Sequence, residues 1–188
     1  MRGAVSRRQR SMRILEHPFG TDVFAVPEQE DMVAGSRTSK PLAVAGIVLG
    51  IGLGGFVDGI LLHQIWQVHA MLSAKVPLTT MANMQTNMTA DGVFHAMVWI
   101  ATLTGIIMLF NAARRADIFL SARVFYGSML AGWGIFNVVE GIIDHHILEV
   151  HHVVERLGQS IWDWLFLGCS VVLIFFGWKI ASGGRAAV

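Results

Sequence analysis

Charged residues are scarce in this chain. Only 14% of its 188 residues are charged, whereas soluble domains carry about 25%. Seven Lys/Arg and five Asp/Glu fall within the first forty residues, so the rest of the sequence is poorer still. That remainder has too little charge to solvate the surface of a globular domain of this size. The sequence therefore predicts a membrane protein.

Cysteine and proline are also rare, with one Cys and four Pro. These counts argue against disulfide-stapled, collagen-like and disordered chains. Cys169 falls inside an apolar run and is expected to be inert. The basic residues are not gathered on one predicted face, so no nucleic-acid partner is expected. The sequence also has no Gly-rich phosphate loop and no nucleophile elbow.

Long hydrophobic runs make up most of the sequence. A spanning helix needs roughly 20 mostly apolar residues, and the runs predict four spans, at about residues 42–72, 91–113, 119–148 and 161–181. The predicted fold class is all-α: a polytopic membrane protein with four transmembrane helices in a bundle. We expect no internal repeat and no pair of broken helices, which disfavours a transporter.

The flanks of these runs predict an orientation. Twelve of the 14 Lys/Arg lie before the first span, around the connection between the second and third, or at the C-terminal end; only Lys75 and Arg156 lie on the other side. By the positive-inside rule both termini are cytoplasmic, in a bacterial inner membrane whose lipid bilayer is the first partner. The domain organisation is a loosely ordered tail (1–40), a transmembrane domain (41–181) and a short tail (182–188). No apolar run precedes Leu42, so a cleaved signal peptide is not expected.

Almost all ionisable residues of the spans fall at their extracytoplasmic end. Intramembrane ionisable groups are costly and are candidate functional residues by default. Four separate segments contribute them at one level. They are Asp58, His63, His69, Asp91, His95, Glu140, Asp144, His145, His146, Glu149, His151, His152 and Asp163.

Imidazole and carboxylate side chains together suit a transition metal ion, and a carboxylate beside a ligating His fixes its tautomer. Asp91 and His95 are neighbours on one helix face, as are Glu140 and Asp144. For His69, His151 and His152 a solvated position at the rim is as compatible with the sequence as a position in the site. The predicted metal ligands are His63, His95, His145, His146, Asp58, Asp91 and His152, and the predicted catalytic carboxylates are Glu140 and Asp144. Copper, iron or zinc is the expected ion.

Three strings in the sequence resemble those of a bacterial family of four-span membrane proteins known only as a domain of unknown function. The strings are GFVDGILLHQIWQVHAMLS, DGVFHAMVWIATLTG and GWGIFNVVEGIIDHHILEVHHV, and the resemblance covers about residues 41–181. The resemblance implies the four-span fold but no activity. The motif residues that it carries over are Asp58, His63, Asp91, His95, Asn137, Glu140, Asp144, His145, His146, His151 and His152. One position departs from the pattern: a His–His pair is expected at the end of the first string, where this chain has Val68–His69.

Several functions are compatible with these features. The first is a metal-dependent oxidoreductase or hydrolase. A second is a copper-handling or assembly protein for a respiratory oxidase, in which Met81, Met84 and Met88 would carry Cu(I). A third is a haem-binding electron-transfer subunit, and a fourth is a proton-relay subunit of a larger membrane complex. The metal, its nuclearity, the substrate and assembly into a homo-oligomer are left open.

Overall fold

The structure, a computed structural model, describes residues 38–184. Almost all of the two predicted tails lies outside the described residues, so their loose order stays a prediction. Within this range the chain is helical, with one isolated β-bridge between Thr38 and Ile118. The four long helices are α2 (Lys40–Val57), α3 (Met81–Ala113), α4 (Ala122–Glu140) and α5 (Ile161–Gly183). Two π-helical segments, η1 (Asp58–Ile65) and η2 (Gly141–Ile147), continue α2 and α4, and a short 3₁₀ helix, η3 (Glu155–Leu157), precedes α5.

Three stretches of the described chain are long and apolar enough to cross a bilayer: Lys40–Ile65, Met81–Ala113 and Ile161–Gly183. The all-helical fold and three of the four predicted spans are therefore confirmed. Helix α4 falls short in apolar character because it carries small and polar residues such as Ser128 and Asn137, both buried between neighbouring helices.

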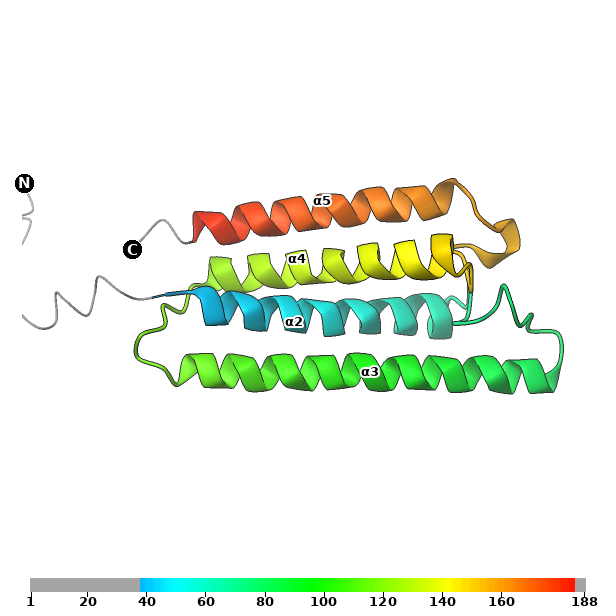
Figure 1. The fold of residues 1–188 in the computed structure, drawn as a ribbon, viewed down its shortest axis with the longest axis horizontal. Helices are drawn as coiled ribbons and strands as arrows, with labels where there is room; N and C mark the ends of the chain where they lie inside the picture. Colours follow the sequence, from blue (N-terminus) through cyan, green and yellow to red (C-terminus); the bar gives the residue numbers. More distant parts are fainter. Residues whose placement is uncertain (1–37, 185–188) are drawn as a thin grey trace, which may run out of the picture.

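The helices pack in a single row instead of around one shared core. The order across the row is α3–α2–α4–α5, and extensive contacts join neighbours only (Figure 1). Half of the apolar window of α2 is buried, against 17% in the outer helices α3 and α5. The four helices thus form a layer whose outer helices present apolar side chains to the surroundings, as a lipid-facing surface requires.

Glycines bring the two central helices, α2 and α4, into close contact. A Cβ atom on Gly50 would overlap the backbone carbonyl of Met129, and one on Gly132 would overlap that of Ile47. Small residues at such positions let membrane helices approach until their backbones touch. The two contacts are equivalent, because in each a glycine of one helix meets a backbone carbonyl of the other.

The chain is built from two matching halves, α2–η1–α3 and α4–η2–α5, so the expectation of no internal repeat is wrong. The segments VDGILLHQIWQVH (57–69) and VEGIIDHHILEVH (139–151) align without a gap. The identical pairs are Val57/Val139, Gly59/Gly141, Ile60/Ile142, His63/His145, Ile65/Ile147, Val68/Val150 and His69/His151.

Helix contacts repeat in the same way. Gly52 approaches the backbone nitrogen of Thr102 in α3, and its counterpart Gly134 approaches that of Ile174 in α5. Leu49 abuts Gly105, as Ala131 abuts Gly177. The row is therefore two α-hairpins related by an approximate twofold axis between α2 and α4. The repeat is hidden because α3 and α5 share few letters and the connection before α3 is longer than the one before α5.

Replacing Gly132 by Ala is expected to lower the free energy of unfolding of the detergent-purified protein by about 1–3 kcal/mol, because the added methyl group meets a backbone carbonyl that cannot move aside. Gly168→Ala on α5 is the matched control, because nothing lies within 4 Å of a Cβ there. Thermal unfolding followed by circular dichroism measures both. An unchanged midpoint for Gly132→Ala would contradict the close α2–α4 packing.

Candidate metal centre

Buried histidines and carboxylates gather where α2 and α4 end. This is the end of the four helices that lies opposite the α3–α4 connection (Figure 1). They come from both halves of the chain and from the two connections that follow η1 and η2. The buried members are Asp58, His63, His69, Asp91, Glu140, His145, His151, His152 and Asp163. The predicted convergence of ionisable residues at one end is thus found in the structure.

The two helix ends have the same local geometry. Wide π-type hydrogen bonds run from Trp66 N to Leu61 O and from Leu148 N to Ile143 O, each 2.8 Å long. The next residues, Gln67 and Glu149, have positive φ angles of 51° and 49°. A left-handed residue after a helix turns the chain sharply. Each connection therefore folds back, and the histidine two residues later points toward the axis between the halves.

The rings of His69 and His151 are fixed by a reciprocal exchange between the connections. The Nδ1 of His69 donates to the carbonyl oxygen of Val153, and the Nδ1 of His151 donates to that of Met71, both at 3.1 Å. A carbonyl oxygen can only accept, so the ring proton lies on Nδ1. The Nε2 atoms are left pointing inward.

Carboxylates from the outer helices lie beside the other two rings. The Nδ1 of His63 donates to Asp91 Oδ1 at 2.8 Å, and the Nδ1 of His145 lies 3.3 Å from Asp163 Oδ1. The same carboxylates accept the backbone N–H groups of Met71 and Val153, each at 3.0 Å. Such carboxylate–histidine pairs orient the rings of metal-ligating histidines.

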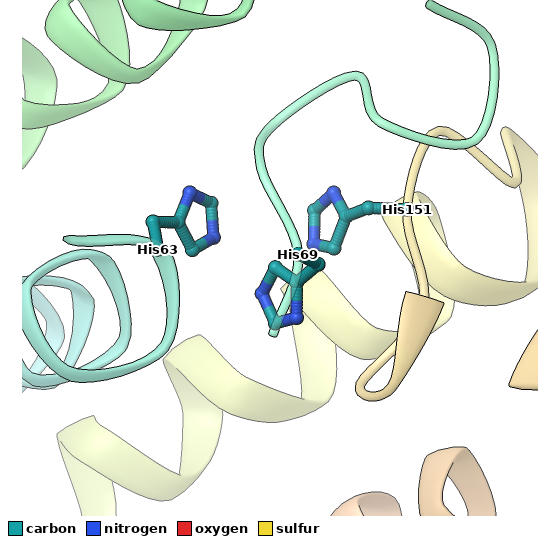
Figure 2. A group of neighbouring side chains, drawn as sticks. All are labelled: His63, His69 and His151. Atoms are coloured by element: carbon teal, nitrogen blue, oxygen red, sulfur yellow. The ribbon is translucent and has the colours of Figure 1, made fainter. Parts of the chain in front are cut away.

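Two overlapping groups of possible ligand atoms lie at this place. His63, His69 and His151 offer ligand atoms that all lie within 4.8 Å of one another (Figure 2), and Glu140, His145 and His151 form a second such group. In Figure 2 His63 projects from a helix end, and His69 and His151 project from the two connections. The Nε2 atoms of His63, His69 and His145 are buried and have no hydrogen-bond partner among the described residues.

Two carboxylates of the inner helices border the same place. Glu140 Oε1 lies 3.0 Å from the Nε2 atoms of both His145 and His151, and its Oε2 is buried without a partner among the described residues. Its counterpart Asp58 lies with Oδ2 3.3 Å from the Nε2 of His63. Carboxylate and imidazole donors therefore alternate around the centre.

His69 and His151 differ in their tendency to carry a charge. Burial and the neighbouring imidazoles of His151 and His63 lower the pKa of His69 to about 3, so that His69 is neutral and its Nε2 keeps a lone pair. Burial opposes a charge on His151, but the hydrogen bond to Glu140 and its negative charge raise the pKa of His151. A cation at this centre would take the place of the proton that His151 shares with Glu140.

The structure brings some of the predicted site residues together and separates others. His63, His145, Asp58 and Glu140 border the centre, and Asp91 stands behind His63.

The remaining predicted residues have other surroundings. The Nδ1 of His95 donates to the backbone carbonyl of Asp91 at 2.7 Å, and that of His146 donates to the carbonyl of Gly141 at 2.8 Å. His152 Nδ1 lies 3.6 Å from Asp163 Oδ1, behind the ring of His145. Asp144 is half-buried one turn after Glu140. None of these four belongs to either group of converging ligand atoms within residues 38–184.

His69 and His151, for which a rim position was equally compatible with the sequence, are the two most central rings. Both are buried, and their ring centroids lie 4.7 Å apart in a stacked arrangement. The signal that could have placed them is the repeated Val–His at the end of each matching segment. Asp163 was recognised only as an acid at the right level, and its contact with His145 depends on how α5 packs beside α4.

A pocket of about 150 Å³ opens beside the centre on the first half. Its lining is apolar apart from Asp58 and Asn137 and consists of Val57, Asp58, Leu61, Leu62, Trp66, Trp133, Asn137 and Phe166. The carboxylate of Asp58 therefore lies between this pocket and the ring of His63.

Comparison with known proteins identifies one family, described as "Predicted membrane protein (DUF2243)", which matches residues 45–184. The chain belongs to this family. The match covers both halves of the row and every residue of the centre, and it confirms the resemblance recognised in the three sequence strings. No curated protein and no solved structure matches the chain.

Asp163→Ala is expected to destabilise the fold by about 1–3 kcal/mol for each backbone N–H that loses its acceptor, because Asp163 accepts from Val153 N and Ser160 N and is fully buried. Thermal unfolding measures the loss. Asp117→Ala serves as the control, since Asp117 is exposed and pairs with exposed Arg115. Equal midpoints for the two variants would contradict the anchoring role of Asp163.

Proposed function

We propose that this protein is an integral membrane metalloprotein that binds a transition metal (copper, iron or zinc) at the extracytoplasmic end of its helices. The observation that carries the proposal is a buried group of imidazoles and carboxylates at one place. The Nε2 of His69 and the Oε2 of Glu140 have no hydrogen-bond partner within the described residues, and the Nε2 atoms of His63 and His145 face only carboxylate oxygens. Leaving a buried polar atom without a partner costs about 1–3 kcal/mol. Several such atoms pointing at one volume are expected where a cation satisfies them together.

The tautomers support the same interpretation. Each of the four rings has Nδ1 beside a carbonyl or carboxylate oxygen and Nε2 turned toward the centre. The Nε2 of His69 offers a lone pair to the centre, and the Nε2 of His63 faces the carboxylate of Asp58. A lone pair and carboxylates gathered at one place are the surroundings that a metal cation requires.

The ring spacing disfavours haem. Two axial imidazoles must lie on opposite faces of a porphyrin. His63 and His69 have ring centroids only 4.5 Å apart, and those of His145 and His151 are 4.9 Å apart. Rings in direct contact leave no room for a macrocycle between them.

Metal-assisted oxidation or hydrolysis is the class of reaction that this donor set would serve, with the ion supplying Lewis-acid or redox chemistry. Glu140 remains the first candidate for a proton-accepting group, since its Oε2 faces no donor of the described chain. A role for Asp144 stays a prediction. The apolar pocket beside Asp58 would admit a small lipid-soluble molecule.

Copper handling is the second candidate. Met81, Met84 and Met88 follow one another at i, i+3 and i+7 at the start of α3, and all three are exposed. That spacing aligns them along one face of the helix, on the end of the row that carries the centre. Exposed thioethers would suit transfer of Cu(I). If the bound ion is copper, the protein would therefore serve as a copper-handling protein.

The orientation is part of the proposal. With α4 crossing the membrane as a fourth span, both ends of the chain lie in the cytoplasm and the two connections around the centre lie outside. Helix α4 tolerates its polar residues because α2 and α5 flank it on both sides.

Single-cysteine labelling tests this topology in a Cys169→Ser background. Lys75→Cys and Arg156→Cys should react with a membrane-impermeant maleimide in sealed, right-side-out spheroplasts, whereas Arg115→Cys should react only after permeabilisation. All three native residues are exposed. Protection of Arg156→Cys together with reaction of Lys75→Cys would contradict a spanning α4.

Elemental analysis of the detergent-purified full chain tests the metal centre. Wild-type protein, as purified or after incubation with Zn²⁺, Cu²⁺ or Fe²⁺ and gel filtration, should retain one of these ions in at least stoichiometric amount. The His63→Gln/His145→Gln double variant should retain none. His95→Gln is the control and should behave as wild type, since His95 belongs to neither group of converging ligand atoms within residues 38–184. Wild-type protein that stays empty with all three ions would refute the proposal.

A further inference from the structure

The twofold repeat of the chain gives the centre two equal sets of donors. Each set contains a carboxylate at the end of an inner helix, a histidine five residues later and a histidine six residues after that. The first set is Asp58, His63 and His69, and the second is Glu140, His145 and His151. We propose that the centre binds two metal ions, one per half of the chain, an inference that rests on the proposed metal-binding function.

Distances assign each central ring to its own half. The ring of His63 lies nearer to that of His69 (4.5 Å between centroids) than to that of His151 (5.5 Å). The ring of His145 lies nearer to that of His151 (4.9 Å) than to that of His69 (6.4 Å). The separation of the donors therefore follows the duplication.

The carboxylates divide in the same way. Asp58 lies 3.3 Å from the Nε2 of His63, and Glu140 lies 3.0 Å from the Nε2 atoms of His145 and His151. Each carboxylate thus contacts only histidines of its own half within salt-bridge distance in the described chain. The second half brings Glu140, His145 and His151, whose ligand atoms all lie within 4.8 Å of one another, and the first half brings His63 and His69 with Asp58 beside His63. Three protein ligands leave further positions open on a transition metal ion.

One ion is a poorer fit to these donors. The two groups of converging ligand atoms share His151, whose Nδ1 is occupied by Met71 O, so its Nε2 can serve only one ion. Four imidazoles and two carboxylates also exceed the four ligands of a tetrahedral site. A single ion bound by one group would leave the buried Nε2 of the opposite outer histidine, His63 or His145, without a partner.

The supporting residues are duplicated too. Asp91 and Asp163 stand behind the outer histidines, and Phe94 and Phe166 pack beside the same rings, with centroids 6.0 and 5.5 Å away. The duplicated residues would hold two ions at neighbouring positions around the adjacent rings of His69 and His151. Two ions in one site would supply the joint Lewis-acid chemistry of two-metal centres.

Matched single variants test the number of ions. In the full chain, loaded with the ion that the wild type retains, elemental analysis should give two ions per wild-type chain. His63→Gln and His145→Gln should each give one, the double variant none, and His95→Gln two. Circular dichroism and gel filtration of each variant check that loss of metal does not reflect loss of fold.

Loading with Co²⁺ provides an independent readout, since its visible absorption reports the ligands directly. The band should saturate at two equivalents in the wild type and at one in each single variant. One ion per wild-type chain, with either or both single variants empty, would overturn the two-ion proposal while leaving a metalloprotein. An empty wild type would instead overturn the proposed function itself.

Discussion

The contact between α2 and α4 is the constraint on which the rest of the structure depends. At Gly50 and Gly132 the two backbones touch, so the helix axes lie as close as helices can. Both helices run toward the same end, and each widens there into a π-helical turn. Their ends are therefore held side by side, and the segments that carry His63 and His145 start from these adjacent helix ends. A side chain at either glycine would spread the helix ends and separate the two halves of the centre.

The polar centre depends in turn on hydrogen bonds that cross between the halves. The ring of His69 is held by the carbonyl of Val153, and the ring of His151 is held by that of Met71. Each connection therefore orients the central histidine of the other half. The backbone bonds from Ala74 N to Val150 O and from Glu155 N to Val68 O cross the same boundary. Neither hairpin can complete its donor set alone. This reciprocity explains why buried histidines can coexist with an otherwise apolar row of helices.

The sequence predicted the helical class, three of the spans and the end at which the ionisable residues gather, because these depend on composition and spacing along single helices. The choice of ligands stays a prediction, and the structure groups the residues differently. The i, i+4 pair Asp91/His95 was expected to supply two ligands, but His95 lies outside both groups of converging ligand atoms and Asp91 accepts a hydrogen bond from His63 of η1. His69 and His151 were underrated because their burial comes from connections that fold back at left-handed residues. Only the repeat could have indicated this, and the unequal connections concealed it.

The two halves agree in their donors and differ in what surrounds them. Leu62 and Gln64 in the first half correspond to Asp144 and His146 in the second, so the second donor set has the more polar surroundings. The apolar pocket, by contrast, reaches the centre at Asp58. Trp133, Asn137 and Phe166 of the second half line the same pocket, so it opens at the boundary between the halves. An apolar molecule in this pocket would approach the centre along the carboxylate of Asp58, whereas Glu140 faces the rings of His145 and His151. The divergence between the halves therefore gives the two carboxylates different surroundings.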